Sequence, residues 1–291
     1  MDSAFNVFYQ FFDSFAFLVL ASLGLAVIFG MMGIINLAHG EFIMIGAYMT
    51  ATLTRAGVPF FPVAILVAGA VVGVYGLVVE RLVVRYFYRR PLDSVVATWG
   101  IGLIMSQGTL ILLGPTFEGV STPFGWFAVG PNTFSVYRVV LGVCALVLLA
   151  TLYLVFMYTK FGLHARATMQ NPEIARSLGV NTARVYAVTF MIGSALAGLT
   201  GGLFAPTTTI VPNFGTGFTL EAFTTVIVGG ANPLTGTILS AGLLGFIFSG
   251  LSSVWSTFVG RIGLLVATII VIRFLPLGLS GLVSRKTRVR L

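Results

Sequence analysis

The chain has 291 residues, of which 57% are apolar and only 8% are charged, and its net charge is +8. This charged fraction excludes an ordinary soluble domain, in which about a quarter of the residues are charged. A mean hydropathy of +1.03 instead predicts an integral membrane protein, whose spanning helices each need about 20 mainly apolar residues.

Apolar segments follow one another along most of the chain, at residues 14–34, 42–54, 60–84, 94–114, 136–158, 185–206, 217–231, 235–253 and 257–281. Backbone amide and carbonyl groups find no water in hydrocarbon, so these segments are expected to be helices and not open strands. The predicted fold class is all-α, a polytopic bundle of eight or nine membrane segments. We expect a single transmembrane domain, residues 1–291, in which the first helix is not a cleaved signal peptide.

Basic residues gather in three polar breaks between these segments. Such residues are retained on the cytoplasmic side of a membrane, which predicts that the three breaks and the C-terminus are cytoplasmic. Arg55 and the loop 115–135, with Glu118, then fall on the outer side. This orientation explains the positive charge without nucleic-acid binding. The three clusters are Arg81, Arg85, Arg89 and Arg90; Lys160, Arg166, Arg176 and Arg184; and Arg285, Lys286, Arg288 and Arg290.

Two segments, 42–54 and 217–231, are too short to cross about 30 Å of hydrocarbon comfortably. Beside them lie two stretches with the same spacing of Gly and Asn, GIINLAHG at 33–40 and GGANPLTG at 229–236. Short, interrupted segments in corresponding places of two halves are typical of transporters with a site near the membrane midplane. The pattern predicts a pseudo-symmetric internal repeat, although small residues also simply allow helices to pack closely.

The longest polar region, 159–184, contains the signals of one short helix at about 172–178. Asn171 is a candidate N-cap, Pro172 suits the first helical position, and Gly179 is a candidate terminator. Ile174, Ala175 and Leu178 would form its apolar contact face. Two interpretations remain open from these residues alone, since the helix either lies on lipid headgroups or docks on a cytoplasmic partner.

Four stretches together resemble the membrane permease subunits of bacterial ATP-driven importers for branched-chain amino acids, with their urea and short-amide relatives. They are GMMGIINLAHGEFIMIGAYMT at 30–50, RRPLDSVVATWGIGLIMSQ at 89–107, residues 159–203, which begin TKFGLHARATMQNPEIARSLGVN, and EAFTTVIVGGANPLTGTILSAGLLG at 221–245.

The resemblance implies a location in the bacterial inner membrane and a set of partners. These are a second similar permease or a second copy of this chain, two cytoplasmic ATPases and a periplasmic solute-binding protein, besides membrane lipid. The chain is then not an enzyme and binds no cofactor itself. ATP and Mg²⁺ belong to the ATPases, in agreement with the absence of a GxxxxGK[ST] loop at Lys160 or Lys286.

The stretch 159–184 matches the coupling region of that family, which favours the docking interpretation of the short helix. The residues expected to couple to the ATPases are Asn171, Pro172, Glu173, Ile174, Arg176, Leu178 and Gly179.

Polar and ionisable residues inside membrane segments are costly and usually face a bundle interior or a wet cavity. On this basis the candidate substrate path contains Asn36, His39, Glu41, Trp99, Gln107, Glu221 and Asn232. Three of them have a structural alternative: Glu41 as an acceptor of helix-terminal N–H groups, His39 as a packing residue, and Gln107, like Ser106 and Thr98, as an interhelical hydrogen-bonding group. With one Cys and two His, no metal site is expected.

The cargo implied by the resemblance is a small polar or zwitterionic solute, either a branched-chain amino acid or urea or a short amide. A competing class is an ion-coupled secondary transporter or channel, in which His39, Glu41 and Glu221 would carry protons or ions. A third is a membrane subunit with only a scaffolding role.

Overall fold

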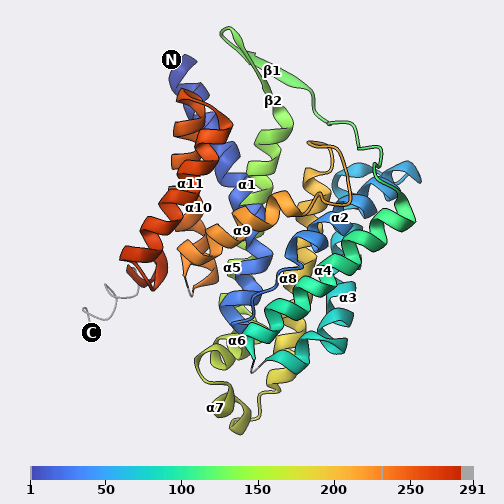
Figure 1. Cartoon of the computed structure of the whole chain (residues 1–291), viewed down its shortest axis with the longest axis vertical. Coiled ribbons are helices and arrows are strands. Elements are labelled where there is room, and N and C mark those ends of the chain that lie inside the picture. The colour runs from blue at the N-terminus through green and yellow to red at the C-terminus, as the bar shows by residue number, and fades with distance from the viewer. Residues whose placement is uncertain (1, 89, 231, 283–291) are drawn as a thin grey trace. The chain divides into compact units, whose positions relative to one another are not determined.

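The computed structural model describes residues 2–88, 90–230 and 232–282 (Figure 1). The predicted C-terminal basic cluster, Arg285 to Arg290, and also Arg89 lie outside the described residues, as does the C-terminus.

Each predicted membrane segment is a helix. The helices are α1 (Asp2–Met32), α2 (His39–Arg55), α3 (Ile65–Leu82), α4 (Pro91–Leu113), α5 (Val136–Tyr158), α8 (Thr182–Phe204), α9 (Thr216–Gly229), α10 (Pro233–Val254) and α11 (Thr257–Phe274). Two further helices, α6 (Lys160–Gln170) and α7 (Pro172–Ser177), lie between α5 and α8, and short helical turns η1 (Phe60–Ala64) and η2 (Val84–Phe87) flank α3.

The helical fold class is confirmed. Among the described residues, seven helices are long and apolar enough to cross a membrane. The other two predicted membrane segments form α2 and α9, which are shorter, with 17 and 14 residues. These are the two segments whose shortness the sequence indicated.

A two-stranded hairpin, β1 (Trp126–Val129) and β2 (Asn132–Ser135), was not predicted. Its strands pair antiparallel with Phe127 opposite Phe134. Gly130 has a positive φ of 61°, which suits the two-residue loop between the strands. Strands this short carry little sequence signal.

The chain divides into two compact units, one of which comprises Leu23–Ser121 and Leu152–Leu220. In this unit α8 packs against α3 and α2 through small residues, as membrane helices commonly do. A Cβ added to Gly76 of α3 would meet the side chain of Ser194, and one added to Gly46 of α2 would meet the backbone of Gly198. Phe42 and Phe190 are fully buried between these helices, with their rings in edge-to-face contact.

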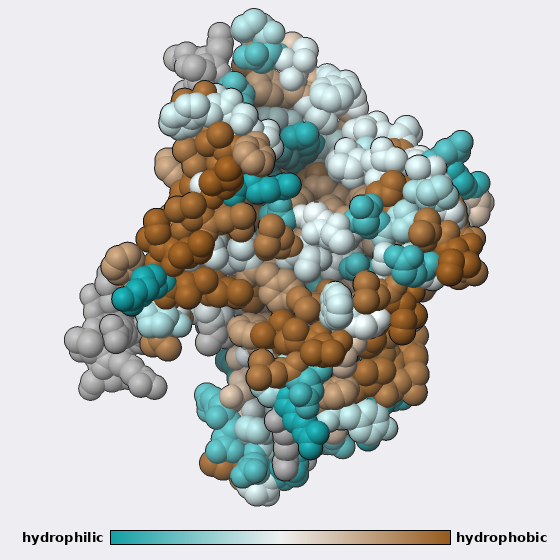
Figure 2. Space-filling view, viewed as in Figure 1, coloured by the Kyte–Doolittle hydropathy of each residue, from teal (hydrophilic) through white to brown (hydrophobic). Residues whose placement is uncertain are grey.

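The surface of this unit changes character along its length. Figure 2 shows hydrophobic surface over α3 and α4 and hydrophilic surface around α6 and α7, at the bottom of the view. Arg55, the last residue of α2, forms an ion pair of 2.6 Å with Glu118. Arg81 and Arg85 of the first basic cluster and Arg184 of the second line one groove, so these two clusters meet, as the orientation argument requires.

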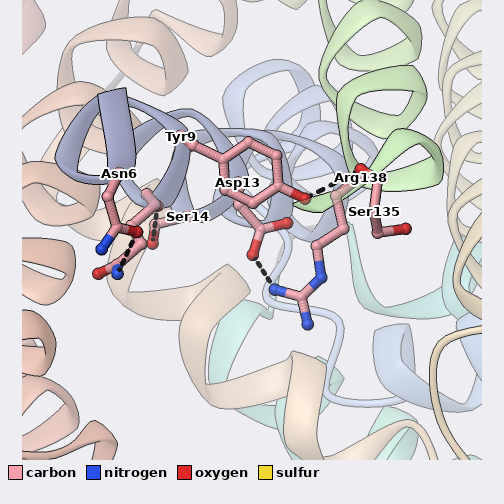
Figure 3. Close-up of polar contacts among 7 residues, drawn as sticks. Asn6, Tyr9, Asp13, Ser14, Ser135 and Arg138 are labelled. Carbon is pink, nitrogen blue, oxygen red and sulfur yellow. Dashed lines mark hydrogen bonds and ion pairs between the residues drawn. The ribbon is translucent and has the colours of Figure 1, made fainter. Parts of the chain in front are cut away.

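The other unit comprises Met1–Ser22, Thr122–Thr151 and Glu221–Leu291. Here α10 packs on α11, with Gly263 against Leu251. Between the start of α1 and the start of α5, Asp13 forms an ion pair with Arg138, and the hydroxyl of Tyr9 donates a 2.9 Å hydrogen bond to the carbonyl of Ser135 (Figure 3).

Candidate transport path and coupling region

The break between α1 and α2 is a non-helical segment, residues 33–38, that begins at Gly33 with a positive φ of 65°. Its backbone groups need partners where no water is available, and side chains supply two of them. Oδ1 of Asn36 accepts a 3.1 Å hydrogen bond from the amide of Ala38, and Oγ1 of Thr98 on α4 accepts one of 3.1 Å from the amide of Leu37. Thr98, which the sequence offered only as a minor polar residue, is therefore what ties α4 to the break.

The polar residues at this break are buried. Asn36 and His39 are completely inaccessible, and Glu41 is 9% exposed. The imidazole of His39 lies over α1, since a Cβ on Gly24 would be 3.1 Å from its Cε1. This packing agrees with the structural alternative for His39.

Glu41 lies in the first turn of α2, where the helix dipole favours an acid. Ala38 at the N-cap has no side-chain group that could cap this helix, and the alternative in which Glu41 accepts helix-terminal N–H groups stays a prediction. The ion pairs found among the described residues do not include Glu41. Its carboxyl group faces α4, because a Cβ on Gly102 would be 3.9 Å from its Cδ.

Trp99 and Gln107 do not join this group. The buried face of α4 carries Ser94, Thr98, Gly102 and Met105. Trp99 is 57% exposed on another side of the helix, and Gln107 is exposed as well. These two residues could line a path only if another subunit or the solute covered them.

In the other unit Glu221 and Asn232 have structural partners. Oε1 of Glu221, a residue only 5% exposed, accepts from Nη2 of Arg261 at 3.0 Å. Oδ1 of Asn232 caps α10 by accepting from the amides of Leu234 and Thr235 at 3.1 and 3.2 Å. Glu221 is therefore neutralised within the chain, and Asn232 holds the start of a helix.

The two breaks share local chemistry. Asn36 and Asn232 each accept a hydrogen bond from the amide two residues ahead. The acids differ in place, since Glu41 follows its break and Glu221 precedes the other one. The internal repeat stays a prediction.

The predicted capping of the short helix in the polar region is confirmed. Oδ1 of Asn171 accepts from the amides of Glu173 and Ile174, both at 3.0 Å, and Pro172 occupies the first turn of α7. At the other end Gly179 has a φ of +88°. The amide of the following Val180 bonds to the carbonyl of Ala175 at 3.0 Å, which is the Schellman arrangement.

The surroundings of α7 differ from the prediction in two respects. A separate helix, α6, precedes it, capped by Thr159, whose Oγ1 accepts from the amide of Gly162 at 3.1 Å. Ala175 is buried inside the chain and not in an outer contact face, whereas Ile174 and Leu178 are 57% and 78% exposed. Arg176 bonds back to Oγ1 of Thr182 at 3.2 Å, which fixes α7 to the start of α8.

Comparisons with known proteins agree on one family. A family described as the permease component of branched-chain amino acid transport systems matches residues 7–275. The high-affinity branched-chain amino acid transport system permease protein LivH of Escherichia coli K12 is 27% identical over 90% of this chain and 90% of its own length. A Methanocaldococcus jannaschii protein named a probable branched-chain amino acid transport permease protein LivH is 30% identical over 93% of this chain and 90% of its own length.

A more distant similarity concerns a sugar permease. The ribose import permease protein RbsC of Escherichia coli K12 is 28% identical over 65% of this chain and 60% of its own length. No solved structure matches the chain.

Proposed function

Because the chain belongs to the family of permease components of branched-chain amino acid transport systems, we propose that it is the membrane-spanning subunit of an ATP-driven importer of branched-chain amino acids. The family match over residues 7–275 carries this proposal. The named LivH relatives favour branched-chain amino acids over urea or short amides as the cargo. The proposed location is a bacterial inner membrane.

The substrate path is proposed to begin from the break between α1 and α2. Asn36, His39 and Glu41 line the break, and Glu41 is the acid there without an ion-pair partner among the described residues. A carboxylate in that position would attract the ammonium group of an amino acid. Glu221 and Asn232, which have partners in the chain, receive structural roles in this proposal.

The exposed side of α4 is proposed to face a second permease subunit. An amide that faces hydrocarbon leaves its donors and acceptors without partners, so the exposed Gln107 favours contact with protein or with the path over contact with lipid. This placement would put Trp99 and Gln107 at the interface between the two permease subunits, where they would line the path.

The movement of the ATPases is proposed to reach the membrane helices through α7. Its caps hold the helix at both ends, and the bond from Arg176 to Thr182 links it to α8, which packs on α2 beside the break. Ile174 and Leu178 are outward-facing apolar residues on a polar part of the surface. They suit a groove on a cytoplasmic ATPase, and a partner that moved α7 would also move α8.

The transport test uses proteoliposomes that contain this chain alone or together with the ATPases, the second permease and the binding protein. Uptake of radiolabelled leucine is expected only in the complete system and only with ATP. Uptake by the chain alone, driven by an ion gradient, would establish the competing secondary transporter.

The coupling test uses single cysteines in a Cys144→Ser background. Ile174→Cys and Leu178→Cys are expected to cross-link to an ATPase, whereas Glu118→Cys, an exposed position at the predicted outer end, serves as the matched control. A membrane-impermeant thiol reagent applied from outside should label only the Glu118→Cys variant. Labelling of the α7 positions from outside would refute the proposed orientation.

A further inference from the structure

A groove lies where α3 ends and α8 begins, away from the break and from the exposed residues of α7. Its volume is about 480 Å³, and its walls come from the last turns of α3, from the segment around η2 and from the first turns of α8. All of these elements belong to one compact unit. The transport proposal assigns no role to this groove.

The floor of the groove holds Glu80, a buried acid that is only 2% exposed. The hydroxyl of Tyr88 donates a hydrogen bond to its Oε1. Burial, with this hydrogen bond, raises the pKa of Tyr88, so the phenol remains a donor at neutral pH. Oε2 of Glu80 is buried and has no hydrogen-bond partner among the described residues. An acceptor buried without a donor is costly, and a donor delivered by a ligand would relieve that cost.

The mouth of the groove is basic. Arg81, Arg85 and Arg184 line it and are exposed. None of the three takes part in an ion pair among the described residues. The planar guanidinium group matches the geometry of phosphate oxygens, so the mouth suits a phosphate or another anion.

The wall that continues along the helices is apolar. Leu77 lies one turn before Arg81 on α3, and Val188 and Met191 lie one and two turns beyond Arg184 on α8. These positions are deeper in the spans, whose ends are Leu82 and Thr182. The order from the helix ends inward is therefore basic, then acidic, then apolar. A phosphate among the arginines at the mouth could extend one of its arms inward to the acid and the other along the apolar wall, because the headgroup and the glycerol that carries the acyl chains are both attached to the phosphate.

We propose that this groove is a binding site for a phospholipid with a primary ammonium headgroup, of the phosphatidylethanolamine type. The ammonium donates a hydrogen bond to Oε2 of Glu80, the phosphate lies among Arg81, Arg85 and Arg184, and an acyl chain follows the apolar wall. Basic pockets between membrane helices are known to hold lipid headgroups. What selects the zwitterion here is the buried carboxylate.

Two related lipids fit less well, for separate reasons. Phosphatidylglycerol brings its negative charge to the arginines but offers no cation to Glu80. Phosphatidylcholine brings a positive charge, but its trimethylammonium group has no N–H to donate. Only the primary ammonium combines a positive charge with a donated hydrogen bond to the carboxylate, and this combination accounts for a preference of roughly ten-fold over either lipid.

The first test needs no substitution. The full-length chain is placed in nanodiscs of equal parts phosphatidylethanolamine, phosphatidylglycerol and phosphatidylcholine with identical acyl chains, then extracted gently, and its retained lipid is measured by native mass spectrometry. Retention of phosphatidylethanolamine is expected to exceed that of the other two by roughly ten-fold. Equal retention of the three lipids, or a preference for phosphatidylglycerol, would overturn the proposal.

Two variants test the assignment of the groups. Glu80→Gln keeps an acceptor for Tyr88 but removes the charge, and it is expected to abolish the preference among the headgroups while lipid is still retained. Arg184→Ala is expected to reduce the retention of all three lipids. Glu118→Gln, a change of the same kind outside the groove, is the control and should behave as the wild type. An unchanged preference in Glu80→Gln would refute the role of the carboxylate.

A free amino acid carries the same pair of ammonium and anionic groups. The nanodisc measurement is therefore repeated with millimolar isoleucine, which is expected to leave the retained lipid in place. Displacement of the lipid by isoleucine would overturn the lipid assignment and transfer the site to a soluble zwitterion. The result does not depend on whether the transport proposal holds, because no ATPase or binding protein takes part.

Discussion

The contact between Gly40 of α2 and Gly215 makes a sharp prediction about stability. A Cβ on Gly40 would meet the carbonyl oxygen of Gly215 and Oγ1 of Thr219 well inside van der Waals distance. The backbone oxygen cannot rotate away, so α2 must shift in Gly40→Ala. Overpacking of this kind costs about 1–3 kcal/mol, and the better helix propensity of Ala returns up to about 1 kcal/mol. The net expectation is a loss of about 1–2 kcal/mol of stability.

The assay is thermal unfolding of the purified protein in detergent. A loss of this size lowers Tm by several degrees, at about 2–4 °C per kcal/mol for domains of moderate size. Gly100→Ala in α4 is the matched control, because a Cβ there meets no atom within 4 Å. Its Tm should be unchanged or higher. If Gly40→Ala melts with or above the wild type, or if both variants fall alike, the close approach of α2 to Gly215 is refuted.

Three further substitutions test the break, the end of α7 and a buried ion pair. Thr98→Val removes the acceptor for the amide of Leu37 and should cost about 1–2 kcal/mol, whereas Thr98→Ser should retain the wild-type Tm; equal losses in both would contradict the hydrogen bond. Gly179→Ala places a side chain at φ +88° and should cost about 1–2 kcal/mol, visible as faster proteolysis next to α7. Arg261→Ala leaves the carboxylate of Glu221 unpaired, so it should lower Tm more than the double variant with Glu221→Gln does; the reverse order would show that the pair contributes nothing.

Local chemistry explains why the short helix of the polar region could be predicted almost to the residue. The Asn171 cap, the proline after it and Gly179 act on their own neighbours in the chain, so no knowledge of the fold is needed. The preceding helix α6 has no comparable capping or terminating residue apart from Thr159. Its inner face depends on contact with α5, where Gly162 sits against the backbone of Phe156, and that contact exists only once the chain has folded.

The orientation of α4 shows the limit of sequence reasoning for the candidate path. This helix is apolar on nearly every side, so it carries no stripe that distinguishes its inner face. Thr98 and Trp99 are neighbours in sequence, yet one is buried at the break and the other is exposed. Because packing against the α1–α2 break sets the rotation of the helix, Trp99 and Gln107 could not be separated from Thr98 beforehand.

The buried acids of the membrane helices differ in how their charge is compensated, and this difference decides which of them suits transport. Glu221 is paired with Arg261, and Glu80 accepts from Tyr88 beside three arginines. A carboxylate that has an ion-pair partner in its own chain, like Glu221, or that holds a bound lipid, as proposed for Glu80, is less available to a passing solute. Glu41 has no ion pair within the described residues and lies in the first turn of α2, directly after the break. This comparison favours Glu41 for a transient ammonium group, and it favours lasting roles for Glu221, which the sequence also suggested, and for Glu80, which it did not.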